Sequence, residues 1–160
     1  MAYLQTTADF LHAEGVGFEI DEEGGSIRFS FAGDTATWMV FVYILEESDR
    51  VAVLSIIPSL ATESVQAEVG RFLHRSNFGL VVGNFEIELD GGEIRFRTSM
   101  DLDDVDLTTS MIRNLIFGNI AVVNDYLPAL NRVLHGGMTA DEAIQMLEGG
   151  QPEETSEDDA

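Results

Sequence analysis

Residues 18–29, FEIDEEGGSIRF, and residues 85–96, FEIELDGGEIRF, resemble each other closely. They match at eight of twelve positions with an offset of 67 residues. In both, apolar residues alternate with charged residues on either side of a Gly–Gly pair, a pattern typical of a β-hairpin. We therefore predict two hairpins, each with a charged face toward solvent and an apolar face toward a core.

The charged residues of the second hairpin predict its register. With Gly91–Gly92 at the turn, Glu88 would lie opposite Arg95 and Glu86 opposite Arg97. A slip of one residue would bury these charges, so the pairing should be well specified.

The segments around the hairpins complete a pattern of helices and strands. A helix ending in Phe–Leu–His precedes each hairpin, which indicates a duplicated helix–hairpin unit. We predict helices at 3–14, 62–75, 106–134 and 140–147, with a kink or break at Pro128 in the third, and further strands at 36–45 and 51–57. These elements predict an α+β domain, an antiparallel sheet of about six strands packed with three to four helices.

Two strands are apolar without alternation. Trp38–Leu45 is an unbroken run of eight apolar residues, and Val51–Ile57 hardly alternates. Strands of this kind are covered on both faces, so either the long helix or a second subunit should cover the face opposite the other helices. We take six of their side chains as a candidate interaction surface: Trp38, Val40, Val42, Ile44, Val53 and Ile57.

Charge and composition exclude several functions. The 160 residues include 29 acidic and 8 basic ones, all of the latter arginine, for a net charge of −21. Such a field repels phosphate backbones and anionic lipid, so neither nucleic acid nor membrane is an expected partner. We expect a cytoplasmic protein, since no signal peptide or membrane segment is evident. The acidic, lysine-free composition fits a halophilic cytoplasm, and a GC-rich genome would also replace lysine by arginine.

The last residues differ from the rest of the chain. Residues 149–160 contain five acidic side chains and no large apolar one. They cannot bury enough surface to offset their ordering entropy. We predict one folded domain over 1–148, followed by a disordered acidic tail over 149–160.

Groups able to carry chemistry are few. Cysteine is absent, and the chain has neither a glycine-rich phosphate loop nor a nucleophile elbow. The carboxylates of Asp101, Asp103, Asp104 and Asp106 do not follow the calcium-loop pattern and are explained by a solvated loop before a helix. Arg71 and Arg75, one helical turn apart, could bind an anion or form a solvated charged face. We therefore predict no catalytic residues, cofactor or metal.

A family resemblance rests on four short motifs. They are Leu73–His74–Arg75–Ser76–Asn77 followed by Gly83–Asn84–Phe85–Glu86–Ile87–Glu88–Leu89–Asp90–Gly91–Gly92–Glu93–Ile94, then Asp125–Tyr126–Leu127–Pro128, His135–Gly136–Gly137 and Thr139-x-x-Glu142–Ala143. With the order of elements, they make residues 3–147 similar to the YbjN-domain family. The resemblance implies a type III secretion chaperone-like fold and a sensory-transduction regulator, and it implies no catalytic residues.

These observations lead to one principal functional prediction. We expect a non-enzymatic module that binds a protein or peptide client and acts as a homodimer, since secretion chaperones of similar fold commonly dimerise. The alternative is a small-ligand or metal-binding sensor or enzyme that uses the 101–106 carboxylates or Arg71 and Arg75.

Overall fold

The computed structural model describes residues 2–149. In this part of the chain the α-helices are α1 (Ala2–Ala13), α2 (Gln66–Gly79), α3 (Thr109–Leu134) and α4 (Ala140–Gly149). The strands are β1 (Glu19–Asp21), β2 (Ser26–Ala32), β3 (Thr37–Leu45), β4 (Arg50–Ile56), β5 (Asn84–Ile87) and β6 (Ile94–Asp101), and the 3-10 helix η1 (Glu46–Ser48) joins β3 to β4. The predicted α+β class is confirmed. Of the predicted tail, residues 149–160, only Gly149 is among the described residues, as the last residue of α4.

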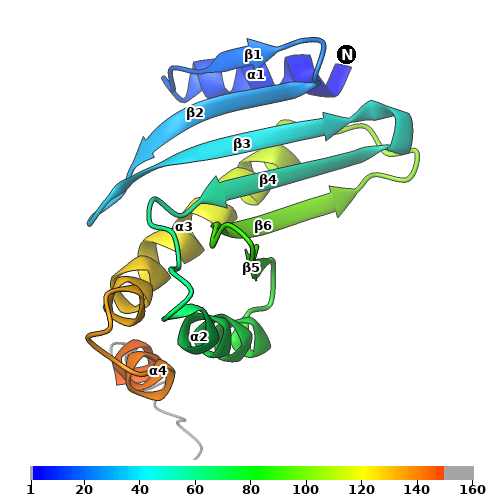
Figure 1. Ribbon diagram of the computed structural model, residues 1–160. Helices are drawn as coiled ribbons and strands as arrows, with labels where there is room; N and C mark the ends of the chain where they lie inside the picture. Colours follow the sequence, from blue (N-terminus) through cyan, green and yellow to red (C-terminus); the bar gives the residue numbers. More distant parts are fainter. Residues whose placement is uncertain (1, 150–160) are drawn as a thin grey trace, which may run out of the picture.

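The strands form one antiparallel sheet in the order β1-β2-β3-β4-β6-β5 (Figure 1). The two similar hairpins, β1–β2 and β5–β6, therefore lie at its opposite edges. Their registers are equivalent: Glu19 faces Arg28 in the first, and Glu86 faces Arg95 in the second. Both residues of the second pair come 67 positions after their counterparts, so the repeated sequence corresponds to a repeated structure.

The predicted register of the second hairpin was wrong by two residues. Glu86, rather than Glu88, faces Arg95, and Asn84 faces Arg97. The cause is the turn, where the Glu88 carboxylate accepts hydrogen bonds from the N–H groups of Asp90 and Gly91 at 2.7 and 2.5 Å. This capping removes Glu88 from the strand and lengthens the loop. A shift of two residues preserves the faces, so the charged side chains still point outward.

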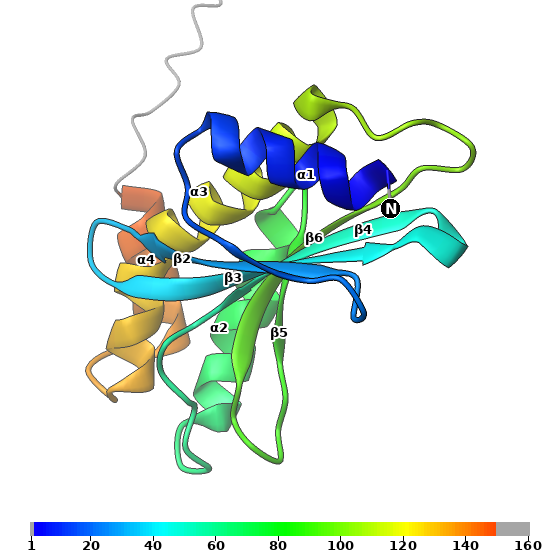
Figure 2. The same ribbon diagram turned by 90° about the horizontal axis from the view of Figure 1, so that it is seen from above.

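The helices α1, α2 and α3 pack on one face of the sheet, which we call the inner face, and α4 packs against α2 and α3. Figure 1 shows α1 and α3 behind the strands and α2 and α4 toward the β5 end, and Figure 2 shows α1 and α3 on the same side of β2 and β3. Most inward side chains of β2 to β6, including Val40, Val53 and Phe96, are fully buried or nearly so. The helix α3 is continuous through Pro128, and it does not wrap to the opposite face.

A buried polar network joins α3 to the middle of the sheet. Asn119 is fully buried, and its Oδ1 accepts a hydrogen bond from the Ser55 hydroxyl at 2.6 Å. Its amide nitrogen donates to the carbonyl oxygens of Val53 and Phe96 at 3.0 and 3.1 Å. The Ser55 oxygen also accepts from the indole nitrogen of Trp38 at 3.0 Å. Because a buried amide is costly unless it is satisfied, these bonds fix the position of α3 over β4 and β6.

Candidate functional site

The six residues predicted to form an interaction surface all point toward the helices. Trp38, Val40, Val42, Ile44, Val53 and Ile57 are each no more than 6% exposed and belong to the core. A partner of this folded structure cannot reach them, so the prediction identified the strands but chose the wrong face. The physical reason is that a run without alternation carries no sign of which side chains point inward.

The opposite side of the same strands is the candidate site, and we call it the outer face. Its centre consists of the outward side chains of β3 and β4: Met39, Phe41, Tyr43, Ala52, Leu54 and Ile56. No helix of residues 2–149 covers them (Figure 2). This arrangement leaves an apolar strip across the middle of the sheet, a kind of surface that is typical of protein interaction sites.

Side chains of the outer face shelter one another. The rings of Phe41 and Tyr43 are stacked, with centroids 6.1 Å apart and an angle of 13° between their planes. Leu54 lies between Phe41 and Arg97 in the register and is only 7% exposed. Met39 is more accessible, at 38%. The strip is therefore a packed, rigid surface that needs little ordering on binding.

Arginines frame this strip. Arg28, Arg50, Arg95 and Arg97 all occupy outward strand positions, which is half of the arginines of the chain. Each pairs with a carboxylate of the same face: Arg28 with Glu19, Arg50 with Asp101, and both Arg95 and Arg97 with Glu86. With Asp21, the outward strand positions carry four arginines and four acidic residues. The outer face is therefore neutral in a chain whose net charge is −21.

Glu86 is the most strongly perturbed carboxylate of this frame. Partial burial by itself raises its pKa, but hydrogen bonds from the guanidinium groups of Arg97 and Arg95 outweigh burial and lower the pKa to about 2. The Nε atoms of Arg95 and Arg97 lie 2.5 and 2.7 Å from its two carboxylate oxygens. Glu86 therefore stays ionised and holds both arginines in place near the apolar strip.

A second exposed apolar group lies at the end of α2 and in the turn that follows it. Phe78 is 95% exposed, Val81 98% and Val82 60%. These side chains come from the end of α2 and the turn after it, whereas the outer face is built from paired strands. They provide a natural comparison for experiments on the outer face.

The alternative prediction named Arg71, Arg75 and the 101–106 carboxylates. In the structure, three of these residues form ion pairs, and the carboxylates do not gather into a metal site. Arg71 and Arg75 do come together, but both bind the carboxylate of Asp141 on α4, Arg71 at 3.1 Å. Asp101 pairs with Arg50 at 3.2 Å. Within residues 2–149, no three histidine, aspartate or glutamate side chains are placed to hold a metal ion. The geometry gives these residues roles in packing and in the loop before α3.

The α+β fold is similar to that of type III secretion chaperones. A chain of the HopA1–SchA chaperone–effector complex has a TM-score of 0.52 and 10% identity, covering 75% of this chain and 88% of that one. A chain of the ExsC–ExsE complex has a TM-score of 0.54 and 16% identity, covering 80% and 92%. At these identities the likeness shows the fold alone.

Sequence comparison identifies the family. The chain belongs to the YbjN family, whose model, described as "Putative bacterial sensory transduction regulator", matches residues 5–132. The crystal structure of YbjN from E. coli has a TM-score of 0.59 and 10% identity, covering 83% of this chain and 92% of that one. No curated protein sequence matches the chain. None of the helices in residues 2–149 is long and apolar enough to cross a membrane.

Proposed function

We propose that this chain is a non-enzymatic, cytoplasmic protein-binding module that acts as a homodimer, with two copies joined through their outer faces. The observation that carries the proposal is the uncovered apolar strip around Phe41, Tyr43 and Leu54 inside a neutral frame of ion pairs. The chaperone-like fold supports binding of a protein client rather than catalysis.

The charge of the chain favours a second copy at this face. Two molecules of net charge −21 repel each other over most of their surfaces. At the outer face, arginines and carboxylates balance, so close approach there adds no net repulsion. A two-fold contact would place each apolar strip on an identical strip and let the framing arginines face carboxylates of the partner. Burial of the strips supplies the favourable free energy.

The alternative, a sensor or enzyme that uses Arg71 and Arg75 or the 101–106 carboxylates, receives less support. An anion at Arg71 and Arg75 would have to compete with Asp141, which both arginines already bind. The Asp103 and Asp104 carboxylates lie on a left-handed stretch of backbone, with φ values of 39° and 66°. That stretch serves to turn the chain between β6 and α3.

Analytical ultracentrifugation over a range of concentrations tests the proposed dimer. The native chain should sediment as a dimer, and Phe41→Asp should shift it to a monomer, because a charge would be buried in the contact. Met39→Asp provides a second variant at a more exposed position. Circular dichroism and Trp38 fluorescence establish that each variant is folded.

The matched control is Phe78→Asp, which places the same charge at an exposed position in the last turn of α2. It should leave the dimer unchanged. A native chain that stays monomeric, or a dimer that Phe78→Asp dissociates and Phe41→Asp does not, would contradict the outer-face interface.

A further inference from the structure

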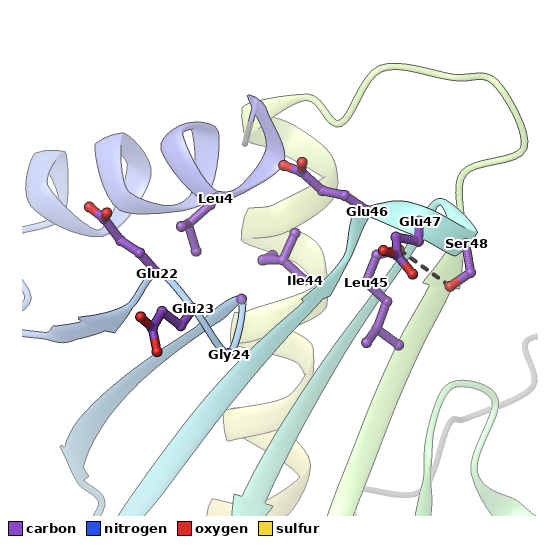
Figure 3. Close-up of a pocket in the computed structure, with 10 residues that line it drawn as sticks. Leu4, Glu22, Glu23, Gly24, Ile44, Leu45, Glu46, Glu47 and Ser48 are labelled. Carbon is purple, nitrogen blue, oxygen red and sulfur yellow. Dashed lines mark hydrogen bonds between the residues drawn. The ribbon is translucent and has the colours of Figure 1, made fainter.

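A groove lies at the end of the sheet where α1, the β1–β2 turn and the β3–η1 corner meet (Figure 3). It is a cavity of about 490 Å³ whose apolar part is formed by the side chains of Leu4 and Ile44, which point toward each other. A second cavity of about 310 Å³ shares Leu4 and Glu22 and continues between α1 and β1 past Ile20. Because they share these residues, the two cavities adjoin each other alongside α1.

The rim of this groove is acidic. Glu22 and Glu23 stand on the β1–β2 turn, and Glu46 and Glu47 stand on η1 across from them (Figure 3). No basic side chain lines either cavity. Among the described residues, seven of the eight arginines form ion pairs with carboxylates that do not line the groove. They are Arg28, Arg50, Arg71, Arg75, Arg95, Arg97 and Arg113. Glu22, Glu23 and Glu47 thus face the groove without an arginine partner.

The negative field extends beyond the rim to the start of α1. The Tyr3 hydroxyl donates to the Asp49 carboxylate at 3.3 Å. Burial, the Asp49 carboxylate and the more distant Asp106 and Asp104 raise the pKa of Tyr3. Carboxylates of η1, of the residue after it and of the 101–106 loop therefore converge on the end of the molecule that holds the groove.

We infer that this groove binds a cationic, amphipathic peptide segment of a protein client. A large apolar side chain of the client fills the cavity over Leu4 and Ile44, and lysines or arginines beside it meet Glu22, Glu23 and Glu47. The inference rests on the proposed protein-binding function and names the chemistry of its client. Charge separates the two surfaces: the neutral outer face accepts a second copy of a −21 chain, whereas the acidic groove repels one and attracts a basic segment.

Fluorescence anisotropy with three labelled peptides tests the groove in the full chain. The first carries a Leu–Phe pair flanked by lysines, the second replaces the lysines by glutamates, and the third keeps the lysines and replaces Leu–Phe by Gly–Ser. Only the first should bind tightly, because it supplies both the apolar side chain and the positive charge. Equal binding of the first and third peptides would overturn the inference, since it would show general attraction to an acidic surface.

Matched variants locate the binding. Glu22→Gln with Glu23→Gln should weaken binding of the first peptide about tenfold, as two partly exposed charge pairs together contribute about 1.4 kcal/mol. Glu63→Gln with Glu93→Gln removes the same charge from exposed positions that line neither cavity and should have little effect. Equal weakening by both pairs of substitutions would overturn the inference.

Sedimentation of the same variants distinguishes this inference from the proposed function. The Glu22→Gln/Glu23→Gln chain should remain a dimer, and Phe41→Asp should lose the dimer and keep the peptide. A dimer that binds none of the peptides would refute the groove and leave the outer-face interface intact. A monomer that binds the first peptide would refute the interface alone.

Discussion

Asn77, near the end of α2, pairs with both backbone groups of Phe85 on β5. The Phe85 N–H donates to its Oδ1 at 2.7 Å, and its Nδ2 donates to the Phe85 carbonyl at 3.0 Å. Because β5 is an edge strand with β6 on one side only, this amide occupies the position that the backbone of a further strand would take. It closes part of an edge that would otherwise be open to pairing with other chains.

Replacing Asn77 should loosen this edge locally. In Asn77→Ala the Phe85 amide loses its acceptor, so its hydrogen exchange should accelerate and the free energy of unfolding should fall by about 1 kcal/mol. Hydrogen exchange read by NMR measures the first effect, and urea unfolding measures the second. Asn84→Ala is the control, because the Asn84 side chain makes only longer contacts of 3.4 and 3.5 Å. Unchanged exchange at Phe85 would contradict the edge-closing role.

Loss of the buried Asn119 amide should be more damaging. Asn119→Leu leaves the Ser55 hydroxyl and the Val53 and Phe96 carbonyls without this partner, so we expect a loss of about 2 to 4 kcal/mol in stability. Urea unfolding followed by Trp38 fluorescence measures it. Asn124→Ala on the same helix should cost about 1 kcal/mol or less, since Asn124 bonds only to the exposed Asp34. Similar losses for both variants would contradict a special role for the network.

Glu86 should make the stability depend on pH. Its pKa is about 2 in the folded chain, against an ordinary value of 4.5 for a glutamate. The stabilisation is therefore fully present above about pH 4.5 and is lost as the pH falls toward 2. Allowing for solvent screening, Glu86→Gln should lower stability by about 1 to 2 kcal/mol at pH 7, and the difference should shrink toward pH 2.

The control for Glu86 is its counterpart in the first hairpin. Glu19→Gln should have a smaller effect, because the side chains of Arg28 and Glu19 are 56% and 70% exposed. Urea unfolding at a series of pH values compares the two variants. A Glu86→Gln difference that does not change with pH would contradict the ion-pair explanation.

Salt should stabilise the chain. With 29 acidic and 8 basic residues, repulsion between carboxylates opposes the folded state at low ionic strength and is screened within about 3 Å at 1 M salt. The melting temperature in molar KCl should therefore exceed that in dilute buffer, as a halophilic origin also predicts. A melting temperature measured in sucrose provides the control, because sucrose is excluded from the protein surface but does not screen charge. A lower melting temperature in KCl would contradict both the screening argument and the halophilic origin.

Much of the fold follows from local patterns in the sequence. Alternation around Gly24–Gly25 and Gly91–Gly92 predicted the two hairpins, and they do occupy equivalent places at the two edges of the sheet. The register of the second hairpin was missed, because the Glu88 carboxylate caps turn amides in a way that alternation does not reveal. The buried role of Asn119 was also missed. The sequence indicates it only by a polar side chain that stands among the buried apolar residues of the long helix.

The sequence by itself determined the α+β class, the duplicated hairpins, the acidic character and the presence of two strands too apolar for a solvent face. Only the tertiary structure decided which side of those strands is accessible. That choice depends on where the helices pack, and a strand apolar at every position offers both sides to them equally. Once the helices pack on the side of the sheet that carries Val40 and Val42, Phe41 and Tyr43 must point away from the core. The arginines that neutralise this side come from strands distant in sequence, and their gathering follows from strand pairing rather than from any local motif.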